Sequence, residues 1–168
     1  MPLDPKQQPP YYTPGTPGTI NNKYTRLNAQ YTAVQTSGTT ETDLYTYTLP
    51  ANSLTTNGDG ILITFCTQAP DSTVNNTLRF YFNAVQQFTD TIDTGEAIIT
   101  HKLEILRIST TEVKITTHQV YASGTNFTQI QTVNSLDFTN TIPIKFTGQC
   151  PNPGQLQTYF MTIDKITL

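Results

Sequence analysis

The sequence predicts an all-β fold, a sandwich of two packed sheets, and three observations support this prediction. Threonine supplies about one residue in five, and charged residues are 12% of the chain, about half the usual share of roughly 25%. Because threonine is β-branched, it suits a half-exposed pleated surface. Several segments alternate apolar and polar residues, and none shows a helical period. At 168 residues, the chain is long enough for one domain with a substantial core.

Residues 1–22 differ in composition from the rest of the chain and are predicted to form an extended, proline-rich N-terminal arm. Six prolines and two glycines fall in residues 2–18, and such a segment suits neither a sheet nor a helix. It is either a disordered leader or an arm that lies along a neighbouring subunit. Tyr11, Tyr12 and Ile20 favour the arm, because a pure spacer has no need of large side chains. The folded domain is then expected over residues 23–168.

From Asn28 onward, the chain consists of short apolar or alternating segments separated by clusters of turn residues, as is typical of strands. We expect strands near residues 29–36, 43–49, 60–67, 77–83, 85–91, 96–109, 112–122, 128–134, 141–147 and 157–167.

The segment LPANSLTTNGDGILITFCTQ, residues 49–68, ends one strand, turns, and begins the next. Pro50 ends the first strand because it cannot donate a backbone hydrogen bond. The turn is predicted at residues 57–60 (Asn-Gly-Asp-Gly), where the glycines tolerate positive φ and the Asn and Asp side chains can hydrogen-bond their own backbone. Residues 61–66 are apolar at nearly every position, which predicts a strand covered on both faces.

Alternation identifies the side chains that face the core. In the strand near residues 77–83, Leu78, Phe80 and Phe82 alternate with Arg79 and Tyr81, which separates an inner from an outer face. The most buried side chains are predicted to include Ile61, Ile63, Phe65, Phe80 and Phe82.

Two strands contain irregularities. Pro143 interrupts an alternating run and predicts an edge strand or a bulge, because proline cannot donate to a ladder. In the long strand near residues 96–109, Leu103 and Ile105 share one parity, whereas Leu106 and Ile108 take the other. A β-bulge near Ile105 would bring both pairs to the same face.

Four segments resemble a jelly-roll domain found in structural proteins of tailed-phage virions. The first is LPAN-x-L-x-x-NGDG with its apolar strand, and the others are NTLRFYFN (Asn76–Asn83), HKLEILRI (His101–Ile108) and LQTYFMTIDKITL (Leu156–Leu168). The resemblance covers roughly residues 40–168 and implies a jelly-roll β-sandwich that serves as a virion component.

The resemblance implies a structural rather than an enzymatic role. Within the virion, we favour a capsid decoration (cement) protein that stabilises the capsid, with the major capsid protein and itself as partners. Three-fold assembly is what the family implies, so a homotrimer is expected. The alternative is the receptor-binding head of a tail fibre or spike, which would recognise a host glycan or protein. A cellular carbohydrate-binding module is a third interpretation.

Charge and hydropathy exclude several partner classes. The net charge of −3 gives no basic footprint for nucleic acid. No segment is apolar enough to span a membrane, and the first ten residues lack the apolar core of a signal peptide. We therefore expect assembly in a host cytoplasm and a final location in the virion. Cys66 and Cys150 fit that compartment as free thiols, although a disulfide is an alternative.

No catalytic or metal-ligating pattern stands out, and we expect no catalytic residue, no cofactor and no metal. His101 and His118 would lie nearly opposite across a hairpin turning near residues 109–111, but no local third ligand is evident, so exposed strand histidines are expected. Asp59 lacks the spacing of a calcium loop. The sequence has no nucleophile elbow, P-loop or zincin motif.

Two further groups of residues suggest surface contacts. An acidic rim would comprise Asp90, Asp93 and Glu96, although a solvated turn explains them as well. Tyrosines that could present a face for sugar or protein are Tyr24, Tyr31, Tyr45, Tyr47, Tyr121 and Tyr159. Such tyrosines more often pack at the edge of a core or in a subunit interface.

Overall fold

The computed structural model describes residues 23–69, 76–92, 98–122, 124 and 126–167, which form eleven strands and no helix. The strands are β1 (Lys23–Gln30), β2 (Val34–Gln35), β3 (Thr42–Leu49), β4 (Gly60–Gln68), β5 (Asn76–Phe82), β6 (Val85–Ile92), β7 (Ile99–Arg107), β8 (Val113–Tyr121), β9 (Asn126–Val133), β10 (Ile142–Gln149) and β11 (Gln157–Thr167). Within these described ranges, nothing meets the length and hydropathy that a membrane-spanning helix needs.

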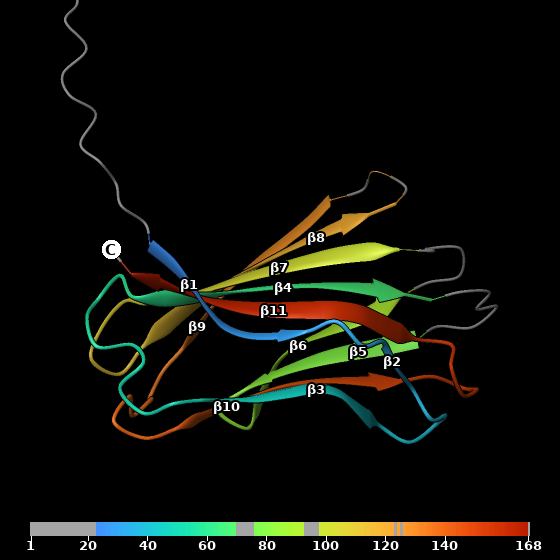
Figure 1. The fold of residues 1–168 in the computed structure, drawn as a ribbon, viewed down its shortest axis with the longest axis horizontal. Coiled ribbons are helices and arrows are strands. Elements are labelled where there is room, and N and C mark those ends of the chain that lie inside the picture. The colour runs from blue at the N-terminus through green and yellow to red at the C-terminus, as the bar shows by residue number, and fades with distance from the viewer. Residues whose placement is uncertain (1–22, 70–75, 93–97, 123, 125, 168) are drawn as a thin grey trace, which may run out of the picture.

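The strands form two antiparallel sheets that pack face to face, as the two layers in Figure 1 show. The larger sheet has the order β1-β11-β4-β7-β8-β9, and β2 pairs with the end of β11 that β1 leaves unpaired. The smaller sheet has the order β3-β10-β5-β6. The prediction of an all-β sandwich is therefore confirmed, and most strand bounds agree within three residues.

The predicted centre of the core is confirmed. Phe65 of β4 and Phe80 and Phe82 of β5 are fully buried, as are Ile61 and Ile63. Each lies at an inward position of its strand, where burial alternates residue by residue. Alternation identified the residues of β5, whereas those of β4 were predicted from a run that is apolar at nearly every position.

A chain of aromatic rings joins the two sheets through the core. In the smaller sheet, the ring centroid of Phe80 lies 5.6 Å from that of Phe88 and 4.7 Å from that of Phe146. Phe146 contacts Phe65 of the larger sheet at 4.4 Å, and Phe65 stacks on His101 at 4.2 Å. These rings fix how the two sheets sit against each other.

The predicted first strand, residues 29–36, is wrong in position. β1 begins at Lys23, where it pairs with Thr167 of β11, and ends at Gln30. Only the two-residue β2 lies within the second half of the predicted range. The prediction failed because β1 is an edge strand with a register shift between Arg26 and Asn28, which breaks the alternation on which the prediction depended.

The predicted bulge near Ile105 does not occur. The registers of β7 with β4 and with β8 are both unbroken, so Leu106 and Ile108 stay off the inward face. The outward positions Leu62 and Cys66 of β4 are likewise half-buried, which corrects the expectation that this strand is covered on both faces. Apolar residues are tolerated on this outer face. The apolar character of a residue was therefore not sufficient to predict that it is buried.

Pro143 lies in a central strand, which corrects the prediction of an edge strand. β10 runs between β3 and β5, but its pairing with β5 begins only at Ile144, one residue after the proline. The missing N–H therefore removes no hydrogen bond to β5. A register shift does occur in β10 opposite β3, but it lies between Phe146 and Thr147.

The loop before β4 is organised by one buried carboxylate. Asp59, 2% exposed, accepts hydrogen bonds from the backbone N–H groups of Thr55 (2.8 Å) and Thr56 (2.9 Å) and from the Thr55 hydroxyl (3.0 Å). The predicted turn is thus present, with Gly58 at a φ of 95°. Gly60 is required for a different reason: a Cβ atom there would lie 2.6 Å from the carbonyl oxygen of Ile105.

Burial alone would raise the pKa of the Asp59 carboxyl, but the hydrogen bonds from Thr56 and Thr55 together outweigh it and lower this pKa below its usual value. We expect Asp59→Ala to reduce the free energy of unfolding by about 2 kcal/mol near neutral pH, since it removes the acceptor that the Thr55 and Thr56 N–H groups share. Because the folded-state pKa is lowered, this contribution is present above the ordinary pKa and is lost as the pH falls through the folded value. Urea unfolding at several pH values measures it.

Asp137 provides the matched control. It accepts the same kind of turn hydrogen bonds, from the Thr139 N–H (2.9 Å) and hydroxyl (2.6 Å), but in an exposed loop. Asp137→Ala should therefore cost clearly less than Asp59→Ala. Equal losses in the two variants would show that burial of the Asp59 carboxylate does not determine its contribution.

Candidate binding pocket

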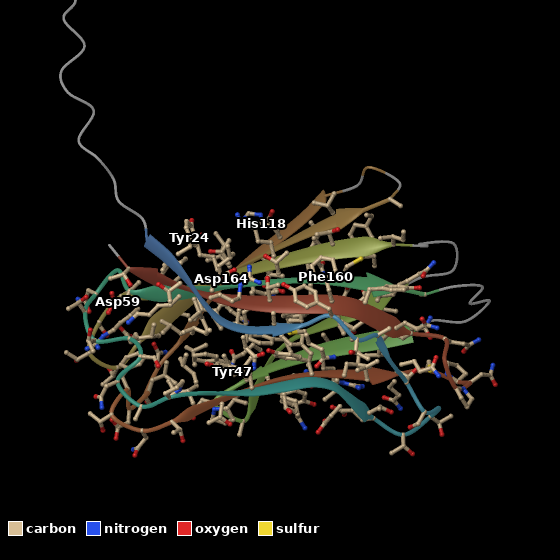
Figure 2. The ribbon with its side chains drawn as sticks, viewed as in Figure 1. Tyr24, Tyr47, Asp59, His118, Phe160 and Asp164 are labelled. Carbon is tan, nitrogen blue, oxygen red and sulfur yellow. The ribbon has the colours of Figure 1, made fainter. Side chains whose placement is uncertain are left out.

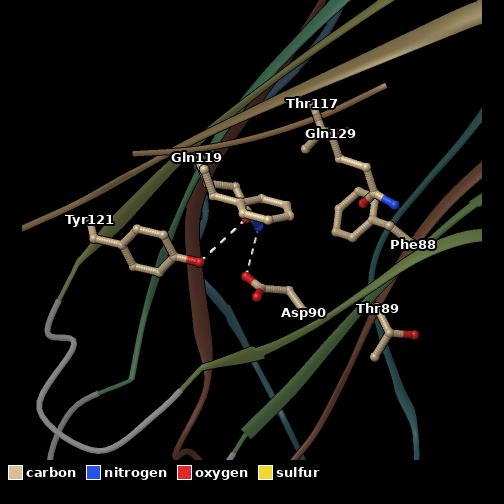
Figure 3. A pocket seen from close by; sticks show the side chains of 8 residues that line it. Phe88, Thr89, Asp90, Thr117, Gln119, Tyr121 and Gln129 are labelled. Carbon is tan, nitrogen blue, oxygen red and sulfur yellow. Dashed lines mark hydrogen bonds between the residues drawn. The ribbon is translucent and has the colours of Figure 1, made fainter. Parts of the chain in front are cut away.

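A pocket opens between the two sheets, where β6 of the smaller sheet faces β8 and β9 of the larger one (Figure 3). Its volume is about 100 Å³. The lining residues are Phe88, Thr89, Asp90, Thr117, Gln119, Tyr121, Phe127 and Gln129.

The pocket exists because the inward positions of β8 change from apolar to polar along the strand. Ile115 is followed at inward positions by Thr117, Gln119 and Tyr121. β9 provides Phe127 opposite Gln119, at a place where Phe127 is still 48% exposed. Thr117, Gln119 and Phe127 were not predicted from the sequence, although polar side chains at the inward positions of β8 were a signal that could have identified Thr117 and Gln119.

Gln119 is the buried centre of the pocket wall. Its Nε2 donates to Asp90 Oδ2 at 2.7 Å and lies 3.2 Å from His101 Nδ1, while its Oε1 accepts from the Tyr121 hydroxyl at 3.3 Å. Figure 3 shows the Asp90 and Tyr121 side chains converging on this amide. Gln119 is only 2% exposed, so these bonds replace the water that its amide loses on folding.

The same bonds define the protonation state of His101. Because the Gln119 amide nitrogen donates to Nδ1, the other ring nitrogen, Nε2, carries the hydrogen and donates to the Thr67 hydroxyl at 2.8 Å. Complete burial lowers the pKa of His101 to about 3. His101 is therefore a neutral core residue at neutral pH.

The expectation of two exposed strand histidines is wrong for His101. The register pairs His101 with Gln119 and His118 with Lys102, so the two imidazoles lie on opposite faces of the sheet. His118 is on the outer face (Figure 2), where its Nδ1 lies 3.1 Å from the Thr128 hydroxyl. In the part of the chain that the structure describes, no three potential ligands gather around a metal position.

Thr67 and His101 form a hydroxyl–imidazole pair, the arrangement that nucleophilic catalysis uses. Here both side chains are fully buried, and the ring nitrogen that faces the hydroxyl is a donor rather than an acceptor. A base must accept the proton of the hydroxyl to activate it. This pair is therefore a core hydrogen bond and does not prepare a nucleophile.

The pocket offers the chemistry that holds a small polar ligand with one apolar face. Asp90 provides a carboxylate, Gln129 an amide and Thr117 a hydroxyl, and Phe88 and Phe127 add aromatic rings. Its volume is below the roughly 150 Å³ of a cavity that holds a benzene ring. The pocket therefore accommodates the edge of one sugar ring or a single side chain rather than a large cofactor.

Of the predicted contact residues that the structure describes, Asp90 and Tyr121 line this pocket and the others do not. Tyr11, Tyr12 and Ile20, expected on the arm, lie outside the described residues, as do Asp93 and Glu96 of the predicted acidic rim. The candidate tyrosines form no single face: Tyr24, Tyr31 and Tyr159 are exposed, Tyr45 is buried, and Tyr47 and Tyr121 are partly buried. Figure 2 places Tyr24 and Tyr47 on different sheets.

Both cysteines are free thiols, as expected. Cys66 is half-buried in β4, where burial raises the pKa of its thiol. Cys150 is buried just after β10, with its sulfur 2.6 Å from the Thr36 hydroxyl.

No protein-family model and no curated protein sequence matches the chain. Among solved structures, peanut lectin with a nine-residue peptide is similar, with a TM-score of 0.50, 9% identity, and coverage of 92% of this chain and 95% of that one. A seed lectin of Lotus tetragonolobus has a TM-score of 0.45 and 9% identity, covering 89% and 95%. A protein of unknown function from Shewanella oneidensis has a TM-score of 0.41 and 11% identity, covering 86% and 75%.

At 9% identity, the likeness to peanut lectin shows the fold alone. Together with the two antiparallel sheets, it defines the class of the protein as a jelly-roll β-sandwich. The jelly-roll fold implied by the sequence resemblance is therefore confirmed.

Proposed function

We propose that the protein is a non-enzymatic structural component of a phage virion. Specifically, it is a capsid decoration (cement) protein that binds the major capsid protein and assembles as a homotrimer. The sequence resemblance supplies the virion context. The role requires stable contacts without turnover, a cofactor or a metal.

The observation that carries this proposal is the position of β1. The strand begins at Lys23, directly after the predicted arm of residues 1–22, and it is an edge strand of the larger sheet. A segment that precedes an edge strand can pass to a neighbouring subunit without crossing the sandwich. This position supports an arm that contacts neighbours on a capsid.

The outer face of the larger sheet also supports an assembly role. Its charges nearly balance: the cations Arg26, Lys102 and Lys114 share the face with Glu104 and Asp164. Threonine fills much of the remainder, and burying a hydrogen-bonded hydroxyl costs far less than burying an ion. Such a surface suits permanent contact with another protein.

Deleting residues 1–22 is expected to abolish attachment to capsids while leaving the unfolding temperature nearly unchanged. The density of prolines keeps this segment out of the sheet ladders, so the sandwich loses little without it. Calorimetry and co-sedimentation with capsids measure the two effects. A control that replaces Tyr11, Tyr12 and Ile20 with serine keeps the arm length and should weaken attachment. A collapse of the unfolding temperature, or undiminished attachment of the deletion variant, contradicts the proposal.

A second candidate function is the receptor-binding head of a tail fibre, and the pocket favours it. A carboxylate and an amide beside two phenylalanine rings are the groups that recognise the hydroxyls and the apolar face of a sugar. Saccharide binding that Asp90→Ala abolishes, together with no affinity for capsids, would select this function over the first.

A further inference from the structure

The two sheets end in edge strands, and three of these edges carry features that block pairing with another strand. β1, β3 and β6 each contain charged residues: Lys23 and Arg26, Asp43, and Asp90, respectively. Each also has a register shift with its neighbour. Charges and bulges on edge strands are the devices by which proteins prevent unwanted edge-to-edge pairing.

Apart from the two-residue β2, the remaining edge strand is β9, and it has neither feature. Its sequence, NFTQIQTV, contains no charge and no proline, and its register with β8 is unbroken from Val133 to Asn126. Among the residues that the structure describes, no strand pairs with its other side. An uncharged edge eight residues long with an unbroken register is a template for another strand.

Apolar side chains are exposed on both faces of this edge. Ile130 points to the outer face and is 60% exposed, and Phe127 points to the pocket face and is 48% exposed. A strand added beside β9 would cover part of both side chains, since cross-strand neighbours lie about 5 Å apart.

The sequence of β9 indicates which strand would pair with it. Around Ile130, the strand reads nearly the same in both directions: Gln129 matches Gln131, Thr128 matches Thr132, and Phe127 matches Val133. In an antiparallel pair centred on Ile130, each of these residues lies opposite its match on a second copy. Apolar residues then meet apolar ones and polar residues meet polar ones, as a self-complementary two-fold interface requires.

We propose that β9 pairs antiparallel with β9 of a second copy, about a two-fold axis through Ile130. The axis is perpendicular to the sheet, so the inward faces of the two copies lie on the same side. The two larger sheets then become one continuous sheet. The two Ile130 side chains meet on the outer face, and Phe127 packs beside Val133 of the other copy on the inner face. The predicted arm is not the strand that pairs with β9, since its prolines prevent it from completing a hydrogen-bond ladder.

This contact does not depend on the proposed role in a virion. A two-fold contact joins copies in pairs, whereas the expected homotrimer uses three-fold contacts, so pairing of trimers would give a hexamer. Loss of the β9 contact halves the mass of the assembly and leaves any trimer and its attachment to capsids intact. The two proposals can therefore fail separately.

The first test is the solution mass, by light scattering over a range of protein concentrations. We expect Ile130→Lys to halve the mass of the associated wild-type protein, because it places two like charges on the two-fold axis. Val85→Lys is the matched control, since Val85 is 59% exposed on β6, an edge strand that has a charge and a register shift. This variant should leave the mass unchanged. An unchanged mass in Ile130→Lys, or an equal loss in both variants, overturns the proposal.

The second test is the register. Directly opposite residues in an antiparallel pair have Cα atoms about 4.5–5.5 Å apart, within the range of a disulfide. Ile130→Cys should therefore form covalently linked pairs under mild oxidation. Thr128→Cys should not exceed the wild-type background set by Cys66 and Cys150, because two copies of residue 128 would lie about 14 Å apart. Equal cross-linking of both variants, or of neither, contradicts this register.

Discussion

Replacing Phe80 with alanine is expected to reduce the free energy of unfolding by about 3–5 kcal/mol. Phe80 is fully buried at the centre of the smaller sheet, and its ring contacts those of Phe88 and Phe146. Through Phe146 it is linked to Phe65, so the cavity would open where the two sheets are held together. Equilibrium unfolding in urea measures the loss.

Phe160→Ala is the control for this prediction. Phe160 is only half-buried and lies in β11 opposite Cys66, at an outward position of the larger sheet (Figure 2). Its removal leaves no enclosed cavity, so its cost should be clearly smaller. A loss below about 1 kcal/mol for Phe80→Ala would mean that the site relaxes and refills.

The second large effect is expected at low pH and originates from His101. Its folded-state pKa of about 3 lies well below its ordinary value of 6.5. The unfolded chain therefore binds a proton that the folded protein excludes. Stability from this residue is complete above the ordinary pKa and falls as the pH drops from there toward 3. Between pH 7 and pH 4, the loss should reach about 3 kcal/mol.

His101→Gln removes the titrating group while retaining an amide that can hydrogen-bond Thr67 and Gln119. The variant should be less stable at pH 7, because it loses the ring stacked on Phe65, but its stability should depend less on pH. His118→Gln is the matched control, since His118 is exposed on the outer face, and it should keep the wild-type slope. Equal slopes for His101→Gln and the wild type would show that His101 is not the group responsible.

The sequence was sufficient to predict the core, because the deciding pattern is local. In β4 and β5, every second residue is large and apolar, and the parity of such a strand determines which face is buried. The Asp59 turn was also predictable, since its Asn-Gly-Asp-Gly sequence favours a tight turn by itself, although Gly58 and Asp59 also exchange backbone hydrogen bonds with Arg107 of β7.

The errors occurred where distant residues decide. His101 is buried because its register with Gln119 turns it inward, where its ring donates a hydrogen bond to Thr67 of another strand. Nothing close to residue 101 in sequence indicates that partner. The pocket was missed for a related reason: β9 is an edge strand of the larger sheet, and its inward residues Phe127 and Gln129 stay exposed beside β6 of the smaller sheet. Which strands face each other across the two sheets is a tertiary property. The alternation of apolar and polar residues within one strand does not predict it.

The place of β11 in the larger sheet has a consequence for how the protein folds during synthesis. β11 lies between β1 and β4, so the first described strand can join its sheet only after residues 157–167 have left the ribosome. Until then, β4 lacks a neighbour on one side, and β1 lacks the strand with which it pairs in the described part of the chain. Pairing over so long a sequence separation is slow, because the loop must close before any contact compensates the lost entropy. Nascent chains are therefore exposed to aggregation until β11 has emerged and completed the larger sheet.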